Sequence, residues 1–213
     1  MKSRFKALLG SASAIGAAAF GIVAVQAPAV AQTTSATTNY RADLRALPNT
    51  SGQGTALLRL SADKRTLTIQ IRASGLERGP HLSHIHGLSA NGQPVNSTCP
   101  TIAQDSDRDG FVELAEGQVT YGPILIDFDN IDPNQDGAIF FTKTIQLTGS
   151  EGVLPLQDRH IVIHGKSVGT VGAGTPGEVD GTAGYKILLP VLCGEIQAVA
   201  DGNGRRTIPR RRN

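Results

Sequence analysis

The feature that most constrains the fold is a period-two alternation of apolar and polar residues. Leu58 and Leu60 precede a short polar turn, and Leu67, Ile69 and Ile71 follow it, with polar or charged residues between them. Because neighbouring side chains of a strand point to opposite faces, this pattern predicts a β-hairpin with one buried face.

Other segments predict further strands around His84 and at residues 124–128, 139–147, 160–164 and 185–196. Clusters of turn-forming residues separate them. No stretch beyond the N-terminal region has a sustained helical period, and we find no internal repeat or second domain. We therefore predict an all-β fold, with a β-sandwich made of short strands joined by long loops.

The N-terminus has the features of an export signal. Lys2, Arg4 and Lys6 precede a weakly apolar stretch at residues 7–25, and a small-x-small pattern follows at residues 29–31. This order predicts a signal peptide over residues 1–31, with a retained membrane anchor as the alternative. We expect a secreted or periplasmic/extracellular protein.

Three parts follow the signal. Residues 32–53 are a lead-in with the first strand, residues 54–200 form one β-sandwich domain, and residues 201–213 form a basic tail. Residues 32–204 carry 12 Lys and Arg against 18 Asp and Glu, a net charge of −6, so the basic charge lies at the two ends. The tail is either solvated or in contact with an anionic surface or nucleic acid, and the solvated state is the one we expect. We expect metal ions as partners, no nucleic acid and, after signal removal, no membrane; the protein partner is open.

The chain has two cysteines, Cys99 and Cys193. An even count in an exported protein predicts one disulfide. It would close a loop of 94 residues (193 − 99), which the chain-entropy account values at about 4–5 kcal/mol.

All five histidines lie in two short runs, with His81, His84 and His86 in the first and His160 and His164 in the second. On a strand, His84 and His86 point to the same face. Imidazole nitrogen suits copper, zinc or iron, so two rings from one strand and one from another predict a three-nitrogen site. The alternative is that these histidines are structural.

A second metal motif fills the twelve-residue calcium-loop template over residues 105–116. Gly110 supplies the sharp turn, and the usual flanking helices are not expected. The predicted calcium ligands are Asp105, Asp107, Asp109, the carbonyl of Phe111, Glu113 (directly or through water) and Glu116. The alternative is a solvated acidic loop.

A partial copy of this motif follows, with oxygen ligands expected at Asp132, Asn134 and Asp136. Lys143 stands where the last acidic ligand belongs, although Asp127 and Asp129 are close enough in sequence to complete a site. A plain turn fits the segment equally well.

Together these motifs resemble a known family. The strand His84-Ile-His86 followed by Cys99 resembles the copper strand and disulfide loop of Cu/Zn superoxide dismutases, and residues 159–165 and 181–196 resemble later strands of that family. The resemblance covers residues 54–196 and implies a Greek-key sandwich or flattened barrel, with copper on His84, His86 and His164. The first part is equally similar to the CHRD domain, another β-sandwich.

The chain departs from the dismutase pattern at two places. The bridging and zinc histidines expected after Cys99 are absent, and residues 188–192 lack the family's arginine before Cys193. We therefore expect calcium and possible copper binding, without zinc. The leading hypothesis is an exported metal-binding β-sandwich. The alternatives are a copper-only superoxide dismutase and a non-enzymatic CHRD-type interaction module.

Overall fold

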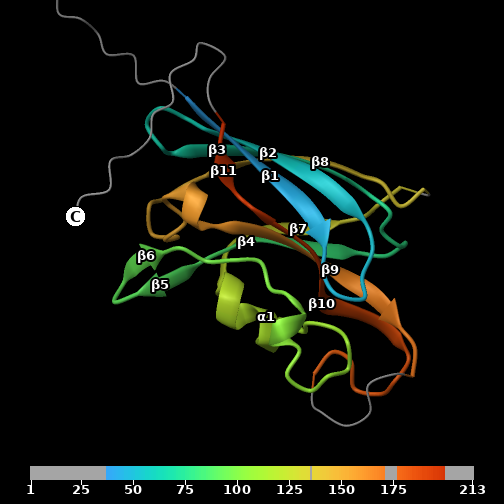
Figure 1. Ribbon diagram of the computed structural model, residues 1–213. Coiled ribbons are helices and arrows are strands. Elements are labelled where there is room, and N and C mark those ends of the chain that lie inside the picture. Colours follow the sequence, from blue (N-terminus) through green and yellow to red (C-terminus); the bar gives the residue numbers. More distant parts are fainter. Residues whose placement is uncertain (1–36, 135, 171–176, 200–213) are drawn as a thin grey trace, which may run out of the picture. The chain divides into compact units, whose positions relative to one another are not determined.

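The computed structural model describes residues 37–134, 136–170 and 177–199 (Figure 1). The predicted signal peptide and basic tail lie outside these ranges. No helix among the described residues is long and apolar enough to span a membrane.

The described chain is nearly all β, as predicted. The strands are β1 (Thr38–Ala46), β2 (Gln53–Leu60), β3 (Thr66–Ser74), β4 (His81–His86), β5 (Leu88–Ala90), β6 (Gln93–Val95), β7 (Ile124–Ile131), β8 (Ile139–Gln146), β9 (His160–Val168), β10 (Gly184–Glu195) and β11 (Gln197–Ala198). Two 3-10 turns, at Ile102–Gln104 and Leu156–Asp158, and one α-helix, α1 (Leu114–Tyr121), complete the elements.

One antiparallel sheet contains nine of the strands, in the order β7-β4-β9-β10-β1-β2-β3-β8, with β11 paired to β1. The ends of the sheet meet across a seam, where the rings of Phe128 in β7 and Phe141 in β8 stack with centroids 6.4 Å apart. The sheet is therefore a nearly closed barrel. Strand β9 returns beside β4 after β7 and β8, which is a Greek-key connection.

The predicted hairpin is β2 and β3. Leu60 lies opposite Leu67, and Leu58 lies opposite Ile69. All four side chains are buried in the barrel core, while the residues between them face outward. The period-two pattern thus places one apolar face of the hairpin inside, and this burial drives the fold.

The predicted disulfide joins Cys99 to Cys193 in β10. It fastens the long connection between β6 and β7 to the outer side of the sheet. Leu47, Tyr121 and Val162 pack around it in a small apolar cluster outside the barrel core. This connection contains the acidic loop and α1.

The sequence predicted no helix beside the acidic loop. That prediction was wrong, because α1 begins within the loop. Its eight residues bury only Gly117 and Tyr121, so no helical periodicity could show. A capping box between Glu113 and Glu116 starts the helix. Gly117 lies within it because a Cβ there would come within 2.4 Å of the Tyr121 ring.

The two layers of the barrel differ on their outer sides. The layer of β7, β4, β9 and β10 has α1 beside it, and strands β4 and β9 are buried on both faces (Figure 1). The layer of β1, β2, β3 and β8 has an exposed outer face.

Candidate metal centre

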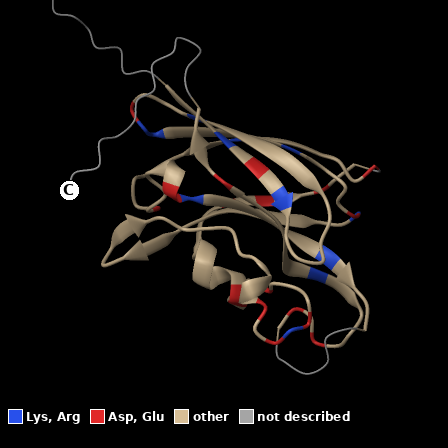
Figure 2. Cartoon of the chain, in the orientation of Figure 1, with Lys and Arg blue, Asp and Glu red and all other residues tan. Residues whose placement is uncertain are grey.

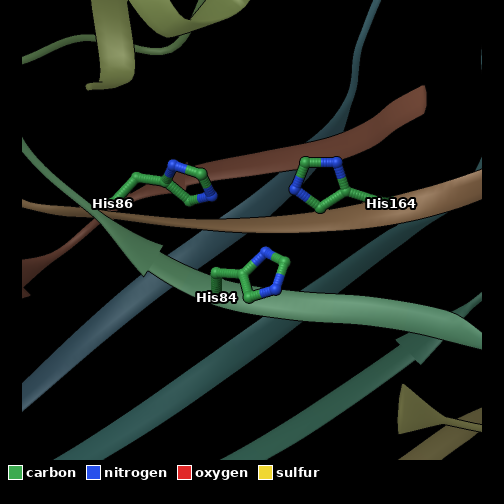
Figure 3. Close-up of side chains that lie close together, drawn as sticks. All are labelled: His84, His86 and His164. Atoms are coloured by element: carbon green, nitrogen blue, oxygen red, sulfur yellow. The ribbon is translucent and has the colours of Figure 1, made fainter. Parts of the chain in front are cut away.

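Three histidines meet on the outer side of the β4–β9 layer. Ile85, Ile161 and Ile163 point into the barrel core, so the alternate residues His84, His86 and His164 point outward. Their rings face one another, with centroids 5.4 Å apart for the first two and 5.1 and 5.8 Å from each of these to His164 (Figure 3). The three side chains are buried.

One nitrogen of each ring has no hydrogen-bond partner. These are Nδ1 of His84 and Nε2 of His86 and His164, and all three atoms are buried. The cluster offers one ligand atom per residue, all within 4.8 Å of one another. Buried polar atoms normally have a hydrogen-bond partner. Three unpartnered nitrogens so close together therefore indicate a site for one ion that all three could bind.

The other nitrogen of each ring is oriented by a neighbour. Nδ1 of His86 lies 2.8 Å from the carbonyl oxygen of Gly122, and Nδ1 of His164 lies 2.7 Å from that of Leu188. A carbonyl can only accept, so each Nδ1 donates and each Nε2 keeps a free lone pair. Nε2 of His84 lies 3.5 Å from the Asp127 carboxylate. Such outer partners orient metal-binding imidazoles.

Burial also keeps these rings neutral. It lowers the pKa of His86 to about 4 and that of His164 to about 3, and it lowers the pKa of His84 against the opposing charge of Asp127. The buried ring of Tyr121 covers His86 edge-on, with centroids 4.7 Å apart. The cluster therefore presents neutral imidazole nitrogens, the form that binds a transition metal.

The two remaining histidines have other contacts. His81 uses both nitrogens, which lie 2.8 Å from the carbonyl oxygen of His164 and 3.0 Å from that of Glu77. His160 bonds Ser97 through Nδ1. Neither belongs to the group whose ligand atoms converge. The cluster is a three-histidine set.

The acidic loop is a second possible metal centre, next to α1 (Figure 2). Carboxylate oxygens of Asp105, Asp107 and Asp109 lie within 4.8 Å of one another. Backbone amides hold all three: Asp105 accepts from Gly110 at 2.9 Å, Asp107 from Asp109 at 3.1 Å, and Asp109 from Phe111 at 2.8 Å. The second oxygen of Asp109 is buried without a hydrogen-bond partner. This concentration of oxygen atoms has the chemistry that calcium requires.

The two glutamates of the motif lie outside this group of three. Glu116 accepts hydrogen bonds from the backbone and hydroxyl of Ser106, at 2.6 and 2.7 Å. Glu113 accepts from the Val179 amide at 2.5 Å. A further acid not anticipated from the sequence, Glu178, accepts from the Leu114 amide. Only the fold could show it, because it is 62 residues beyond Glu116 (178 − 116).

Burial and mutual repulsion raise the pKa values of two acids of the loop. Burial raises the pKa of Asp109, and the charges of Asp107 and Asp105 raise it further. Burial also raises the pKa of Glu113, opposed by the Val179 hydrogen bond and reinforced by the charge of Glu178. A bound cation would relieve this repulsion.

The second acidic segment contains a turn. Asn134 accepts from the amides of Asp136 and Ala138 through its side-chain oxygen. The two acids considered as completing ligands point elsewhere: Asp129 forms an ion pair with Lys143, and Asp127 faces the histidine cluster. Asp132 is not part of either converging group among the described residues.

These observations define the class: a disulfide-bonded, barrel-like β protein with a closed histidine cluster on its outer side. Residues 34–130 match the family model of the CHRD domain. No curated protein matches the chain. The matched segment contains His84, His86, the acidic loop and α1, and it ends before His164. The CHRD part of the resemblance is thus supported, and the disulfide fits an oxidising compartment.

Proposed function

We propose that this protein is an exported, non-enzymatic CHRD-type module that binds copper at its three-histidine cluster and calcium at its acidic loop. The observation that carries copper binding is the convergence of three buried, unpartnered imidazole nitrogens. His84, His86 and His164 would hold the ion, and Cu²⁺ ranks highest in affinity among the common divalent metals.

The closed position of these nitrogens argues against superoxide dismutation. All three have almost no exposed surface, and Tyr121 packs over His86. Copper supplies one-electron redox chemistry when bound, but turnover requires that superoxide reach it. The segment before Cys193 brings the Leu188 carbonyl to His164 and has no arginine to attract an anion.

Calcium is proposed for the acidic loop because four carboxylates besides Glu113 lie within twelve residues. The start of α1 within the loop, at position ten of the template, is the arrangement by which an EF-hand loop leads into its second helix. Calcium would then stabilise α1, whose last residue contacts the histidine cluster.

A competition titration with a copper chelator tests the proposal. The purified exported protein should bind one copper ion. In a separate assay, the copper-loaded protein should not dismutate superoxide faster than the same buffer without protein. If the protein binds no copper under any loading condition, the copper site is rejected and the hypothesis of a CHRD-type interaction module remains. Dismutation near the diffusion limit would contradict the non-enzymatic assignment.

A further inference from the structure

The exposed outer face of β1, β2, β3 and β8 carries a regular set of arginines. We call it the arginine face and define it by Arg41, Arg45, Arg59 and Arg72, which all point away from the core. These are four of the eight arginines in residues 32–204, a segment whose net charge is −6. Half of the arginines of this acidic segment therefore lie on one face.

The strand register spaces these arginines evenly. Pairing of β1, β2 and β3 puts Arg59, Arg41, Arg72 and Arg45 in four successive rows across the strands, one arginine to a row. Successive outward rows on a strand are about 7 Å apart, so the cations extend over about 20 Å along the strand direction. A ladder of single charges matches a partner that repeats a single negative charge.

The face has little internal neutralisation. Asp43 is the one acid in these rows, and it pairs with Arg41 at 2.6 Å. Arg45, Arg59 and Arg72 have no carboxylate partner within the described residues. Their guanidinium groups are planar forks that bind carboxylate or sulfate oxygens in pairs.

The rest of the face suits a sugar chain. Phe140 lies directly opposite Arg72, is 71% exposed, and has the guanidinium carbon of that arginine 5.7 Å above its ring. An open hollow runs over this part of the sheet, lined by Arg41, Arg45, Leu57, Arg72 and Phe140 among others. Apart from Asp43 and Leu57, the other positions of these rows on β1, β2 and β3 are neutral hydrogen-bonding side chains, namely Asn39, Gln53, Thr55, Thr68, Gln70 and Ser74.

We propose that the arginine face binds an acidic polysaccharide, with successive carboxylate or sulfate groups on successive arginines and a sugar ring stacked on Phe140. The hollow is open, which suits a chain lying along the strands, and most of the face is polar, unlike the apolar centre of a protein–protein interface. This inference uses no residue of either metal site and does not depend on metal binding.

Binding of the full chain to polygalacturonate and to dextran sulfate tests the proposal, with neutral dextran as the reference. The triple substitution Arg45→Gln, Arg59→Gln and Arg72→Gln should weaken both affinities at least about 10-fold, and added salt should weaken wild-type binding. Phe140→Ala should weaken binding about threefold and leave its salt dependence unchanged. If the triple variant does not fold, the single change Arg45→Gln replaces it and should give a smaller loss.

Two controls remove positive charge elsewhere. Arg108→Gln, Lys166→Gln and Lys186→Gln together remove three charges from other parts of the chain, and substitution of the five arginines at 205–212 removes the tail charge. Both should change affinity less than about twofold. The proposal is overturned if wild type binds neither polymer, if a control loses as much affinity as the face variant, or if single-stranded DNA binds the face more tightly than the polysaccharides do.

Discussion

The histidine cluster and the acidic loop are joined by one helix, yet they are built in opposite ways. The histidines lie on paired strands, stay neutral through burial, and have their outer nitrogens held by neighbours. The acids lie on a loop, where carboxylates repel and backbone amides hold them. Strand pairing and backbone carbonyls thus hold the histidines in place, whereas repulsion among carboxylates acts against the conformation of the acidic loop.

The change that should alter the free energy of unfolding most is a fall in pH, because the buried histidines and the acidic loop respond to it in opposite directions. Burial lowers the pKa of His86 and His160 to about 4 and of His164 to about 3, so the unfolded chain binds more protons below its own histidine pKa of about 6.5. Metal-free protein should therefore lose about 3 kcal/mol for each histidine as pH falls from about 6.5 to about 4. Denaturant melts at several pH values measure this loss.

The acidic loop should respond with the opposite sign. Its Asp109 and Glu113 have raised pKa values, so their protonation at low pH relieves repulsion and adds stability.

A variant of the histidine cluster separates the two contributions. In a His86→Gln/His164→Gln variant, the loss of stability on acidification should be much smaller. An unchanged pH profile in that variant would show that the histidine cluster does not control acid unfolding.

The next largest effect concerns the copper ligands. His164→Ala or His84→Ala removes one of three converging nitrogens and should lower copper affinity by more than the ~100-fold cost of losing an outer partner. His81→Gln is the matched control because both nitrogens of His81 already bond carbonyl groups. Chelator competition measures the affinities, and equal losses in all three variants would count against the proposed ligand set.

A smaller effect is expected for calcium. Glu116→Gln removes the acid at the last position of the template and should weaken calcium binding about 10-fold or more. Asp43→Asn removes the same charge from a distant face and should leave the affinity unchanged. Calorimetry measures binding, and the absence of calcium heat in the wild type would reject the calcium site.

The smallest effect is expected at Asp127, the outer partner of His84. Its side chain is 61% exposed and lies 3.5 Å from Nε2, so Asp127→Asn should weaken copper binding only about 10-fold, the low end for such partners. Asp129→Asn, two residues along the same strand and paired with Lys143, is the control. Equal effects of the two changes would show a general charge contribution.

Sequence patterns predicted the elements that repeat locally. The period of two gave the β2–β3 hairpin, and the i, i+2 spacing placed His84 and His86 on one face. Contacts that depend on strand register could not be predicted from the sequence. Asp127, for example, lies opposite His84 and not in the second acidic segment, where its sequence position had suggested a role as a ligand. The carbonyl partners Gly122 and Leu188 carry no side-chain signal at all, because they act through the backbone.

The helix was missed for a related reason. Of its eight residues only Gly117 and Tyr121 are buried. Glycine in a sequence predicts against a helix, and the packing of Tyr121 on Gly117 that explains it is seen only in the structure. The even spacing of the arginine face likewise requires the pairing of three strands. Period-two patterning shows that Arg41, Arg59 and Arg72 point outward, but only the register puts them in successive rows.

Electron paramagnetic resonance of the Cu²⁺-loaded protein is the sharpest test of whether the imidazole nitrogens of His84, His86 and His164 hold one copper ion. We expect a spectrum with nitrogen splittings from three imidazoles, which His84→Ala and His164→Ala each reduce by one nitrogen. A spectrum of oxygen ligation that neither substitution changes would contradict the claim.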